Sequence, residues 1–346
     1  MHRAAATLCL VLLASLCLSD ANVFRWLLGR LRPGQRRGER EALAAAGLHN
    51  LGNTCYLNSV LQGLFHVQAF RERMLESRFS KSSVGGDLQS IFRDLCAKQN
   101  AVDTEELVSR LGINVAIQED AQEFYLRLVN SLNSGKEATK AGPDEVFTGE
   151  TEQVIQCLNV DYKKQKKQKF LDLSVDATSS DSLEDSLHML FSEKEQIEHY
   201  KTPDHGQQAA EKALSLSRLP KALCLHLKRF HFDAATESIV KVGKRVSFPV
   251  SLDLAQYLPR ASAEYKTSQA PYELAAIVVH EGTATMGHYT CFARPDLARA
   301  PEAWVRLNDH AVSRVSQETV LEESFGDSDV RGPASKNAYL LFYVAR

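Results

Sequence analysis

The stretch that decides the fold, "GLHNLGNTCYLNSVLQGLF", occupies residues 47–65. It places Cys55 directly after Asn53 and Thr54, two residue types that favour helix starts, and before an apolar run that predicts a buried helix. A thiol at a helix N-terminus lies beside unpaired backbone amides and the positive end of the helix dipole, which favour the thiolate. Cys55 is therefore a candidate nucleophile, and the rest of the chain must supply its partners.

Composition sets the outer limits of the interpretation. The 346 residues allow one large domain or two ordinary ones. The 41 basic and 43 acidic residues nearly balance, and 44% of the chain is hydrophobic. These values describe a globular protein without the basic excess of a nucleic-acid binder, so no nucleic-acid partner is predicted.

The seven cysteines are scattered along the chain and include no C-x-x-C pair. An odd, dispersed set is typical of a thiol protein in a reducing compartment, and it argues against a disulfide framework or a zinc ribbon. No metal or other cofactor is predicted.

The first 21 residues, "MHRAAATLCLVLLASLCLSDA", contradict that compartment. A basic start, an apolar run and small residues near a cleavage point predict a signal peptide over residues 1–21. Residues 22–46 continue as an Arg-rich leader, and the two segments together resemble a bipartite organelle-targeting leader. A membrane-associating amphipathic segment and a mispredicted first exon remain alternatives. The apolar run is shorter than the roughly 20 residues of a membrane span, so no span is predicted once the leader is removed.

The first third of the globular part predicts helices, because apolar residues recur at spacings of three and four. We expect them over residues 55–65, 87–96, 103–111 and 118–132. The basic run "KKQKKQK", residues 163–169, is interpreted as the solvated turn of a hairpin-type segment.

Beyond residue 170 the pattern changes to strands with one more helix, over residues 182–191. Five short runs rich in Val, Leu, Tyr and Phe predict a sheet: "ALCLHLKRF", "YELAAIVVH", "GHYTCFARP", "AWVRLND" and "NAYLLFYVAR". A helical lobe followed by an antiparallel sheet makes an α+β protein. Chemistry in a cleft between the two would need one catalytic group from each side.

His288 stands at the start of a predicted strand, after a glycine-containing turn. A lone histidine in such a place is more often a surface or structural residue. Asn308 and Asp309 change this interpretation, since a carboxamide or carboxylate on the adjacent strand can orient an imidazole. Cys, His and Asn or Asp in this order would form a thiol-protease triad, in which the histidine accepts the thiol proton.

Five motifs follow one another between residues 47 and 346: "GLHNLGNTCYLNSVLQ", "QEDAQEF", "LPKALCLHLKRF", "YELAAIVVHEGTATMGHYTCFAR" and "WVRLNDHAVSRV". They resemble the successive boxes of the ubiquitin-specific proteases, which are papain-like cysteine deubiquitinases. "VIQCLNVDY", "HGQQAAEKALSL" and "NAYLLFYV" are further similar to the herpesvirus-associated branch of that family. The resemblance implies an α+β catalytic domain over residues 47–346, with a helical thumb over about 47–145 and fingers and a β-sheet palm over about 146–346.

The resemblance also implies a role for each matching catalytic residue. Cys55 is the nucleophile, His288 the general base and Asn308 the third triad member, with Asp309 able to share the orienting work. Asn50 matches the side chain that stabilises the oxyanion, with a Cys55 backbone amide as the second donor.

Asp120 and Gln122 match residues that hold the arginine-containing, glycine-terminated tail of ubiquitin. "LKRF", residues 227–230 with Phe230 at its end, His280 and Tyr289 are similar to residues that form the wall of the channel for that tail. Glu119 and Glu123 add negative charge against the arginines of that tail. By itself "QEDAQEF" would be interpreted as the polar face of an amphipathic helix, and Leu227 could equally be a core residue.

The implied partner is ubiquitin or a ubiquitinated protein. The implied reaction is thiol-dependent hydrolysis of the bond at the C-terminal glycine of ubiquitin, and the protein is expected to be a monomer. Many family members hold zinc in the fingers through two C-x-x-C pairs, and the lack of such pairs predicts zinc-free fingers. Two alternatives stay open: a protease for another ubiquitin-like modifier, and a catalytically inactive ubiquitin-binding homologue. A general papain-like peptidase fits less well, because nothing here resembles the C-G-S-C-W pattern of those enzymes.

Two last expectations concern the resting state and the location of the protein. In the branch that the chain resembles, the free enzyme can hold its machinery misaligned, so we expect Cys55 and His288 to lie too far apart for a hydrogen bond. The family resemblance implies the cytoplasm or nucleus, whereas the leader implies the secretory route. A compartment that is reached by that route, such as the one around the complex plastids of some algae, would reconcile the two.

Overall fold

The computed structural model describes residues 45–97, 101–132, 142–259, 271–326 and 335–346. These ranges belong to one compact unit that runs from Leu43 to Arg346. The predicted signal peptide, residues 1–21, and all but the last two residues of the predicted leader, 22–46, lie outside them. Within the described ranges, no helix is long and apolar enough to cross a membrane.

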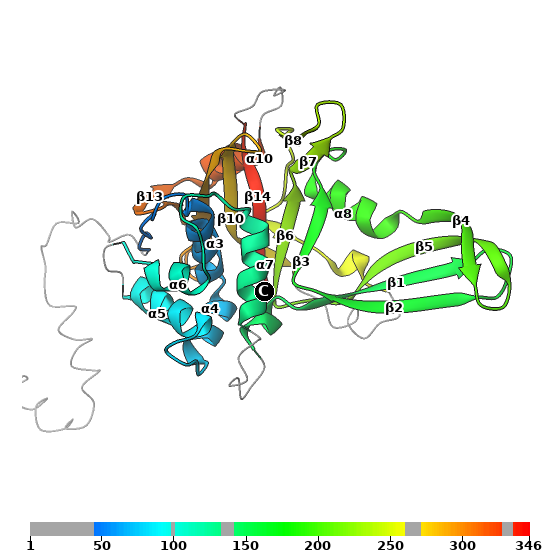
Figure 1. Cartoon of the computed structure of the whole chain (residues 1–346), viewed down its shortest axis with the longest axis horizontal. Helices are drawn as coiled ribbons and strands as arrows, with labels where there is room; N and C mark the ends of the chain where they lie inside the picture. Colours follow the sequence, from blue (N-terminus) through cyan, green and yellow to red (C-terminus); the bar gives the residue numbers. More distant parts are fainter. Residues whose placement is uncertain (1–44, 98–100, 133–141, 260–270, 327–334) are drawn as a thin grey trace, which may run out of the picture. The chain divides into compact units, whose positions relative to one another are not determined.

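Helices make up the first part of this unit, and others lie among the strands that follow (Figure 1). The α-helices are α3 (Cys55–His66), α4 (Gln68–Glu76), α5 (Val84–Cys96), α6 (Glu105–Arg110), α7 (Ala121–Ser131), α8 (Leu183–Ser192) and α10 (Gln317–Phe325), and the 3-10 turns are η1 (Pro143–Val146) and η2 (Ala255–Tyr257).

All five expected helices form, but α4 and α10 were missed by the periodicity. The expectation of one more helix beyond residue 170 is therefore wrong. Both missed helices are nine residues long and bury only two residues each, so they carry a weak apolar stripe. The start of α10 is instead marked by Ser316, whose hydroxyl accepts a hydrogen bond from the Thr319 amide at 3.2 Å.

Helix α3 is enclosed on every side. All twelve of its residues are buried, and it packs against α7 and against the strands β10 (Tyr272–Gly282) and β11 (Gly287–Ala293). Gly63 permits the closest approach, because a β-carbon there would lie 2.6 Å from the Phe342 ring. A helix held so tightly also fixes its first residue, Cys55.

The large sheet has eight strands in the order β13-β12-β11-β10-β14-β6-β3, with β9 paired to β10. Its remaining strands are β3 (Asp172–Asp176), β6 (Ala222–Lys228), β9 (Ser251–Leu252), β12 (Trp304–Asn308), β13 (Ala311–Val315) and β14 (Ser335–Ala345). The five strand runs expected from the sequence all lie in this sheet. The pairing is antiparallel except between β3 and β6, which run parallel.

Both faces of the large sheet are covered, which explains why its central strands are apolar without alternation. Successive residues of a strand point to opposite faces. Cys224 and Phe342 thus join the core beneath α3 and α7, while Leu225 and Leu341 join a second core with Leu187 of α8.

A separate four-stranded antiparallel sheet has the order β2-β1-β5-β4, with β1 (Gly149–Cys157), β2 (Lys163–Phe170), β4 (Glu195–Thr202) and β5 (Gly206–Arg218). A short hairpin of β7 (Phe230–Asp233) and β8 (Ser238–Lys241) completes the strands. The interpretation of residues 163–169 as a turn is wrong, because they form the exposed edge strand β2. Pairing with β1 satisfies one side of the backbone while the lysine side chains stay in water, a common protection of sheet edges.

Candidate active site

Cys55 is the first residue of α3, and its surface is 3% exposed. Thr54 occupies the cap position, but its hydroxyl accepts from the Leu51 amide at 3.0 Å and makes no capping bond to the helix. The amides of the first helical turn therefore lack a side-chain cap. Together with the helix dipole, they favour negative charge at the Cys55 sulfur.

His288 reaches Cys55 from the start of β11. The Nε2 atom of its ring is 2.6 Å from Asn308 Oδ1, at the end of β12. The pKa of His288 is raised from 6.5 to about 9, chiefly by its interaction with the Cys55 side chain, while burial opposes the shift and the Asn308 contact adds to it. A protonated imidazole beside a cysteine sulfur stabilises the thiolate, which is the nucleophilic form.

The Cys55 side chain is close enough to raise the pKa of His288, and the expected separation of the two beyond hydrogen-bonding distance stays a prediction. Both are held by backbone that is already fixed. Cys55 opens the enclosed helix α3, and β11 pairs with β10 from its first residue, where Gly287 lies opposite Gly282.

Asn308 and Asp309 are neighbours in sequence but contact different partners. Asn308 bonds the His288 ring. The Asp309 carboxylate instead accepts from Asn58 Nδ2 and from Asn50 Nδ2, each at 2.8 Å. Asp309 has a φ of 50°, in the left-handed region that aspartate tolerates, and this turns its side chain toward the segment before Cys55.

The carboxamide of Asn50 is fixed in orientation. Its Oδ1 accepts from the amides of Gly52 at 3.0 Å and Thr54 at 3.2 Å, so its Nδ2 must be the atom that faces Asp309. The Nδ2 group carries two hydrogens, and the one not directed at Asp309 can be donated to a ligand oxygen. This side chain is exposed, which leaves it accessible to a ligand.

Gln118 belongs to the same site but was assigned no role from the sequence. Its Nε2 donates to Cys55 Sγ at 3.4 Å and to the Gly287 carbonyl at 2.9 Å, and its Oε1 accepts from the Gly287 amide at 3.2 Å. Gln118 opens the quoted motif "QEDAQEF", but only the folded chain brings it across 169 positions to Gly287.

A cavity of about 520 Å³ contains every residue that the sequence predicted for tail binding. Its walls include Asp120, Gln122, Glu123, Phe230, His280 and Tyr289, together with Gln118. Glu119 is a third carboxylate beside Asp120 and Glu123, and no lysine or arginine lines the cavity. Because Gln118 also contacts the Cys55 sulfur, this acidic cavity adjoins the candidate nucleophile.

Aromatic side chains form the walls of this cavity. The His280 ring lies 5.3 Å from that of Phe230 and 4.6 Å from that of Tyr289, while Tyr339 lies 5.1 Å from Phe230. Burial lowers the pKa of His280 to about 3, so its ring is neutral at physiological pH. Gly287 is required here for space, because a β-carbon would lie 2.1 Å from His280 Nε2.

The polar residues of the cavity are also bound to the fold itself. Asp120 caps α7, with its Oδ1 accepting from the amides of Gln122 at 2.7 Å and Glu123 at 3.1 Å, and its Oδ2 accepts from the Tyr339 hydroxyl. The Gln122 side chain donates to Asp172 Oδ2 at 3.0 Å. Glu123 is exposed, and Leu227 is a fully buried core residue.

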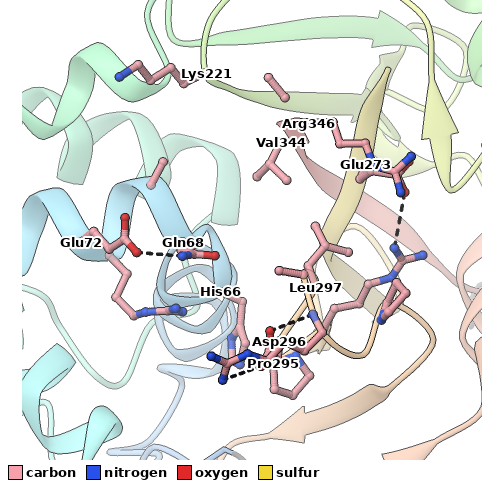
Figure 2. Close-up of a pocket in the computed structure, with 17 residues that line it drawn as sticks. His66, Gln68, Glu72, Lys221, Glu273, Pro295, Asp296, Leu297, Val344 and Arg346 are labelled. Atoms are coloured by element: carbon pink, nitrogen blue, oxygen red, sulfur yellow. Dashed lines mark hydrogen bonds and ion pairs between the residues drawn. The ribbon is translucent and has the colours of Figure 1, made fainter. Parts of the chain in front are cut away.

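A larger cavity, of about 870 Å³, lies at the opposite end of strands β10, β11 and β14 (Figure 2). Its walls carry charges of both signs, such as Glu273, Lys221 and Arg346, and they include no cysteine or serine. Arg294 Nη1 is 3.7 Å from Glu273, and Gln68 bonds Glu72 at 2.7 Å. This space therefore offers no nucleophile for the chemistry that the sequence predicts.

Across the part of the chain that the structure describes, no three His, Cys, Asp or Glu side chains are grouped to hold a metal ion. The five cysteines of that part, Cys55, Cys96, Cys157, Cys224 and Cys291, are free thiols. Zinc-free fingers stay a prediction from the sequence.

The fold and the meeting of thiol, imidazole and carboxamide define a class, the papain-like thiol hydrolases. Residues 46–343 match the family model described as ubiquitin carboxyl-terminal hydrolase. The chain is 31% identical over 324 residues to ubiquitin carboxyl-terminal hydrolase 15 of Schizosaccharomyces pombe, covering 87% of this chain and 28% of that protein. It is 31% identical over 312 residues to ubiquitin carboxyl-terminal hydrolase 7 of Drosophila melanogaster, covering 86% of this chain and 27% of that protein.

A plant relative gives a similar result: the chain is 32% identical over 329 residues to ubiquitin C-terminal hydrolase 13 of Arabidopsis thaliana, covering 86% of this chain and 29% of that protein. The chain belongs to the ubiquitin carboxyl-terminal hydrolase family. It spans less than a third of the length of these three relatives.

Proposed function

We propose that this chain is a cysteine-type deubiquitinase, which hydrolyses the peptide or isopeptide bond after the C-terminal glycine of ubiquitin. The observation that carries the proposal is the interaction of Cys55 with His288 beside an acidic, aromatic-walled cavity, which Gln118 joins to the sulfur. The match of residues 46–343 to the family model supports it.

The chemistry begins with the Cys55 thiolate and the His288 imidazolium. The sulfur attacks the carbonyl carbon of the glycine, and the electron pair of the C=O bond moves to the oxygen. The Asn50 Nδ2 and the Cys55 amide stabilise that oxyanion, and losing one such donor typically costs about 10²–10³ in rate. His288 then gives its proton to the leaving amine, and a thioester remains on Cys55.

Hydrolysis of the thioester restores the enzyme. With the leaving amine gone, neutral His288 takes a proton from water, and the hydroxide attacks the thioester carbonyl. The C–S bond breaks, and Cys55 and His288 return to the thiolate and the imidazolium. Ubiquitin departs as a carboxylic acid, which gives its proton to the solvent and becomes a carboxylate. Asn308 holds the ring so that one nitrogen faces the sulfur throughout, and Asp309 holds Asn50 in the orientation that presents its amide.

The cavity suits the tail of ubiquitin in both charge and width. Its three carboxylates and lack of lysine or arginine favour a cationic segment. The rings of Phe230, His280 and Tyr289 narrow the path, which favours glycine beside the scissile bond. Phe232 and Ile239 pair across the β7–β8 hairpin and are 65% and 56% exposed, so they add an apolar rim for a protein partner.

The test uses the full chain, wild type beside Cys55→Ala, with a thiol-reactive ubiquitin probe and a fluorogenic ubiquitin amide. We expect a covalent adduct and turnover in the wild type and neither in Cys55→Ala. Tight ubiquitin binding without an adduct would favour the inactive homologue. Absence of both binding and adduct, with reaction toward another modifier's probe, would favour the alternative protease.

The domain bounds extend the proposal. The helical thumb takes residues 47–145, and the fingers and palm take residues 146–346. The helices α3 to α7 support the first bound, and the four-stranded and eight-stranded sheets support the second. A monomer is proposed as well, which light scattering of the purified chain would check.

Membership of the herpesvirus-associated branch is a finer proposal, supported by the three sequence segments that resemble it. A phylogeny of family catalytic domains that includes residues 47–346 would test it, and grouping with another branch would contradict it.

The leader carries a proposal of its own: residues 1–21 act as a signal peptide and residues 22–46 direct the chain onward to an organelle. The basic start, the apolar run and the arginines that follow support it. A fluorescent protein fused to residues 1–50 should enter the secretory route, and diffuse cytosolic fluorescence would contradict the proposal.

A further inference from the structure

The strongest unassigned feature of the site is the carboxamide of Gln118. It joins two parts of the fold that the proposed reaction needs together: the nucleophile at the start of α3 and the strand that carries His288. Its three contacts go to the Cys55 sulfur, the Gly287 carbonyl and the Gly287 amide, at 3.4, 2.9 and 3.2 Å. Gly287 is the residue directly before His288.

The orientation of this carboxamide is determined by its partners. The Gly287 carbonyl needs a donor and the Gly287 amide needs an acceptor, so exchanging Nε2 and Oε1 would lose both bonds. Two hydrogens on Nε2 serve the Gly287 carbonyl and the sulfur together. Among side chains of this length, only glutamine offers two donors and an acceptor in one plane.

Gly287 cannot move away from Gln118 freely. On its other side the β-strand pairing places it opposite Gly282, and its α-carbon abuts His280 so closely that a β-carbon would lie 2.1 Å from the His280 ring. The start of β11 is thus held between His280 and Gln118. Because His288 is the next residue, the position of Gly287 also sets the position of the imidazole.

The donor to the sulfur has an electrostatic effect of its own. An N–H directed at a sulfur favours the thiolate over the thiol. The titratable groups that interact with Cys55 are His288 and Tyr289 from β11 and Tyr56 from α3. Burial raises the pKa of both tyrosines, so they stay neutral. Negative charge at the sulfur is therefore stabilised by His288, by the Gln118 amide and by the N-terminus of α3.

We propose that Gln118 is a positioning residue: its carboxamide holds Cys55 and the His288 strand at their reacting separation and donates a hydrogen bond to the thiolate. This inference rests on the proposed function for its role in turnover, but its effect on the thiol does not require a ubiquitin substrate.

The first measurement is alkylation of Cys55 by iodoacetamide between pH 5 and 10, followed by mass spectrometry of the Cys55 peptide in the full chain. The variants are Gln118→Ala, which removes the carboxamide, and Gln118→Glu, which keeps its shape but removes the donors. Gln68→Ala is the matched control, because Gln68 is exposed and bonds only Glu72 in the far cavity. Thermal unfolding identifies any variant that fails to fold.

For both Gln118 variants we expect the pH of half-maximal alkylation to rise by about one unit, and the rate near neutral pH to fall about tenfold. Gln68→Ala should behave as the wild type does. Wild-type alkylation in a folded Gln118→Glu protein would overturn the proposal, because shape alone would then suffice. The same result in Gln118→Ala would also overturn it.

The second measurement is steady-state hydrolysis of a fluorogenic ubiquitin amide. A lost positioning contact should lower kcat about 10- to 100-fold and leave KM nearly unchanged. Faster turnover in Gln118→Ala would overturn the proposal and mark the carboxamide as an obstruction. A wild-type chain that does not turn over the amide would contradict the proposed function alone, since the alkylation result still decides the role of Gln118.

Discussion

The two cavities lie at opposite ends of strands β10, β11 and β14, and they differ in volume and in the charges of their lining residues. His280, Tyr289 and Tyr339 line the smaller one, whereas Glu273, Arg294 and Val344 on or next to the same strands line the larger one. His280 lies seven positions after Glu273 in β10, about 23 Å along the extended chain. The larger cavity has the greater volume, about 870 against 520 Å³, but the smaller one adjoins Cys55.

The difference shows that volume does not locate the chemistry in this fold. Charges in the larger cavity are of both signs, and several are paired, as Arg294 is with Glu273. The smaller cavity holds carboxylates without lysine or arginine, and it adjoins a thiol that interacts with an imidazole. A cluster of charges of one sign beside a nucleophile with a perturbed environment is typical of a catalytic site. Ion pairs between opposite charges are common on protein surfaces.

The largest expected effect on activity distinguishes the site beside the smaller cavity from the larger cavity. Cys55→Ala should lower kcat/KM for a fluorogenic ubiquitin amide by about 10⁴-fold or more, because the nucleophile is gone. Arg299→Ala in the larger cavity should leave it unchanged within about twofold, since its exposed guanidinium is far from the thiol. A comparable loss in both variants would place the larger cavity in the reaction.

A second pair of substitutions tests the division of work between Asn308 and Asp309. Each change to alanine should lower kcat by about 10²–10³-fold, the first through a misoriented imidazole and the second through a displaced Asn50. The NMR titration midpoint of His288 distinguishes them. It should fall more in Asn308→Ala, because Asn308 bonds the ring and Asp309 acts only through its charge. Equal shifts would mean that both residues orient His288.

The pH dependence offers a third contrast. The pKa of His288 is raised from 6.5 to about 9, mainly by its interaction with the Cys55 side chain, so the imidazolium persists until about pH 9. Above that value kcat/KM should fall about tenfold per pH unit as the proton for the leaving amine is lost. The stability from this pair is complete below 6.5 and disappears as the pH rises through 9. NMR titration in Cys55→Ala should find a lower midpoint, and a midpoint that stays near 9 would contradict the pairing.

The histidine of the larger cavity sharpens this contrast. Burial lowers the pKa of His66 from 6.5 to about 4, so His66 is neutral throughout the alkaline range where His288 titrates. Its substitution by Gln should leave the alkaline limb of the activity profile in place.

The smallest expected effect concerns the charge of the channel. Glu123→Gln should raise KM about two- to fivefold with kcat nearly constant, because one exposed carboxylate contributes about 1 kcal/mol or less to a cationic tail. The difference should shrink at high salt. Glu72→Gln in the larger cavity is the control and should leave KM unchanged. A salt-independent rise in KM would point to a change of shape instead of a lost charge.

Most of the large elements followed from local patterns in the sequence. Helices with a strong apolar stripe, such as α5, and strands rich in branched and aromatic residues, such as β10, were predictable because their signals repeat within a few residues. Short helices with weak stripes, α4 and α10, were not. The strand over residues 163–169 was not predictable either. Its side chains are polar, and its backbone forms a strand only through pairing with β1.

The sequence by itself determined the chemical inventory of this protein: a cysteine at a helix start, a histidine at a strand start, an Asn-Asp pair, and an acidic motif that supplies the channel. Only the tertiary structure decided which partner each group takes. Asn308 rather than Asp309 bonds His288, Asp309 bonds Asn50, and Gln118 joins Cys55 to Gly287. These contacts span up to 259 positions of the chain. A hydrogen bond forms only when the donor–acceptor distance is correct to within a few tenths of an ångström. Local sequence patterns do not predict contacts between residues so far apart in the chain. The packing of α3 against the large sheet determines which of these groups lie within hydrogen-bonding distance.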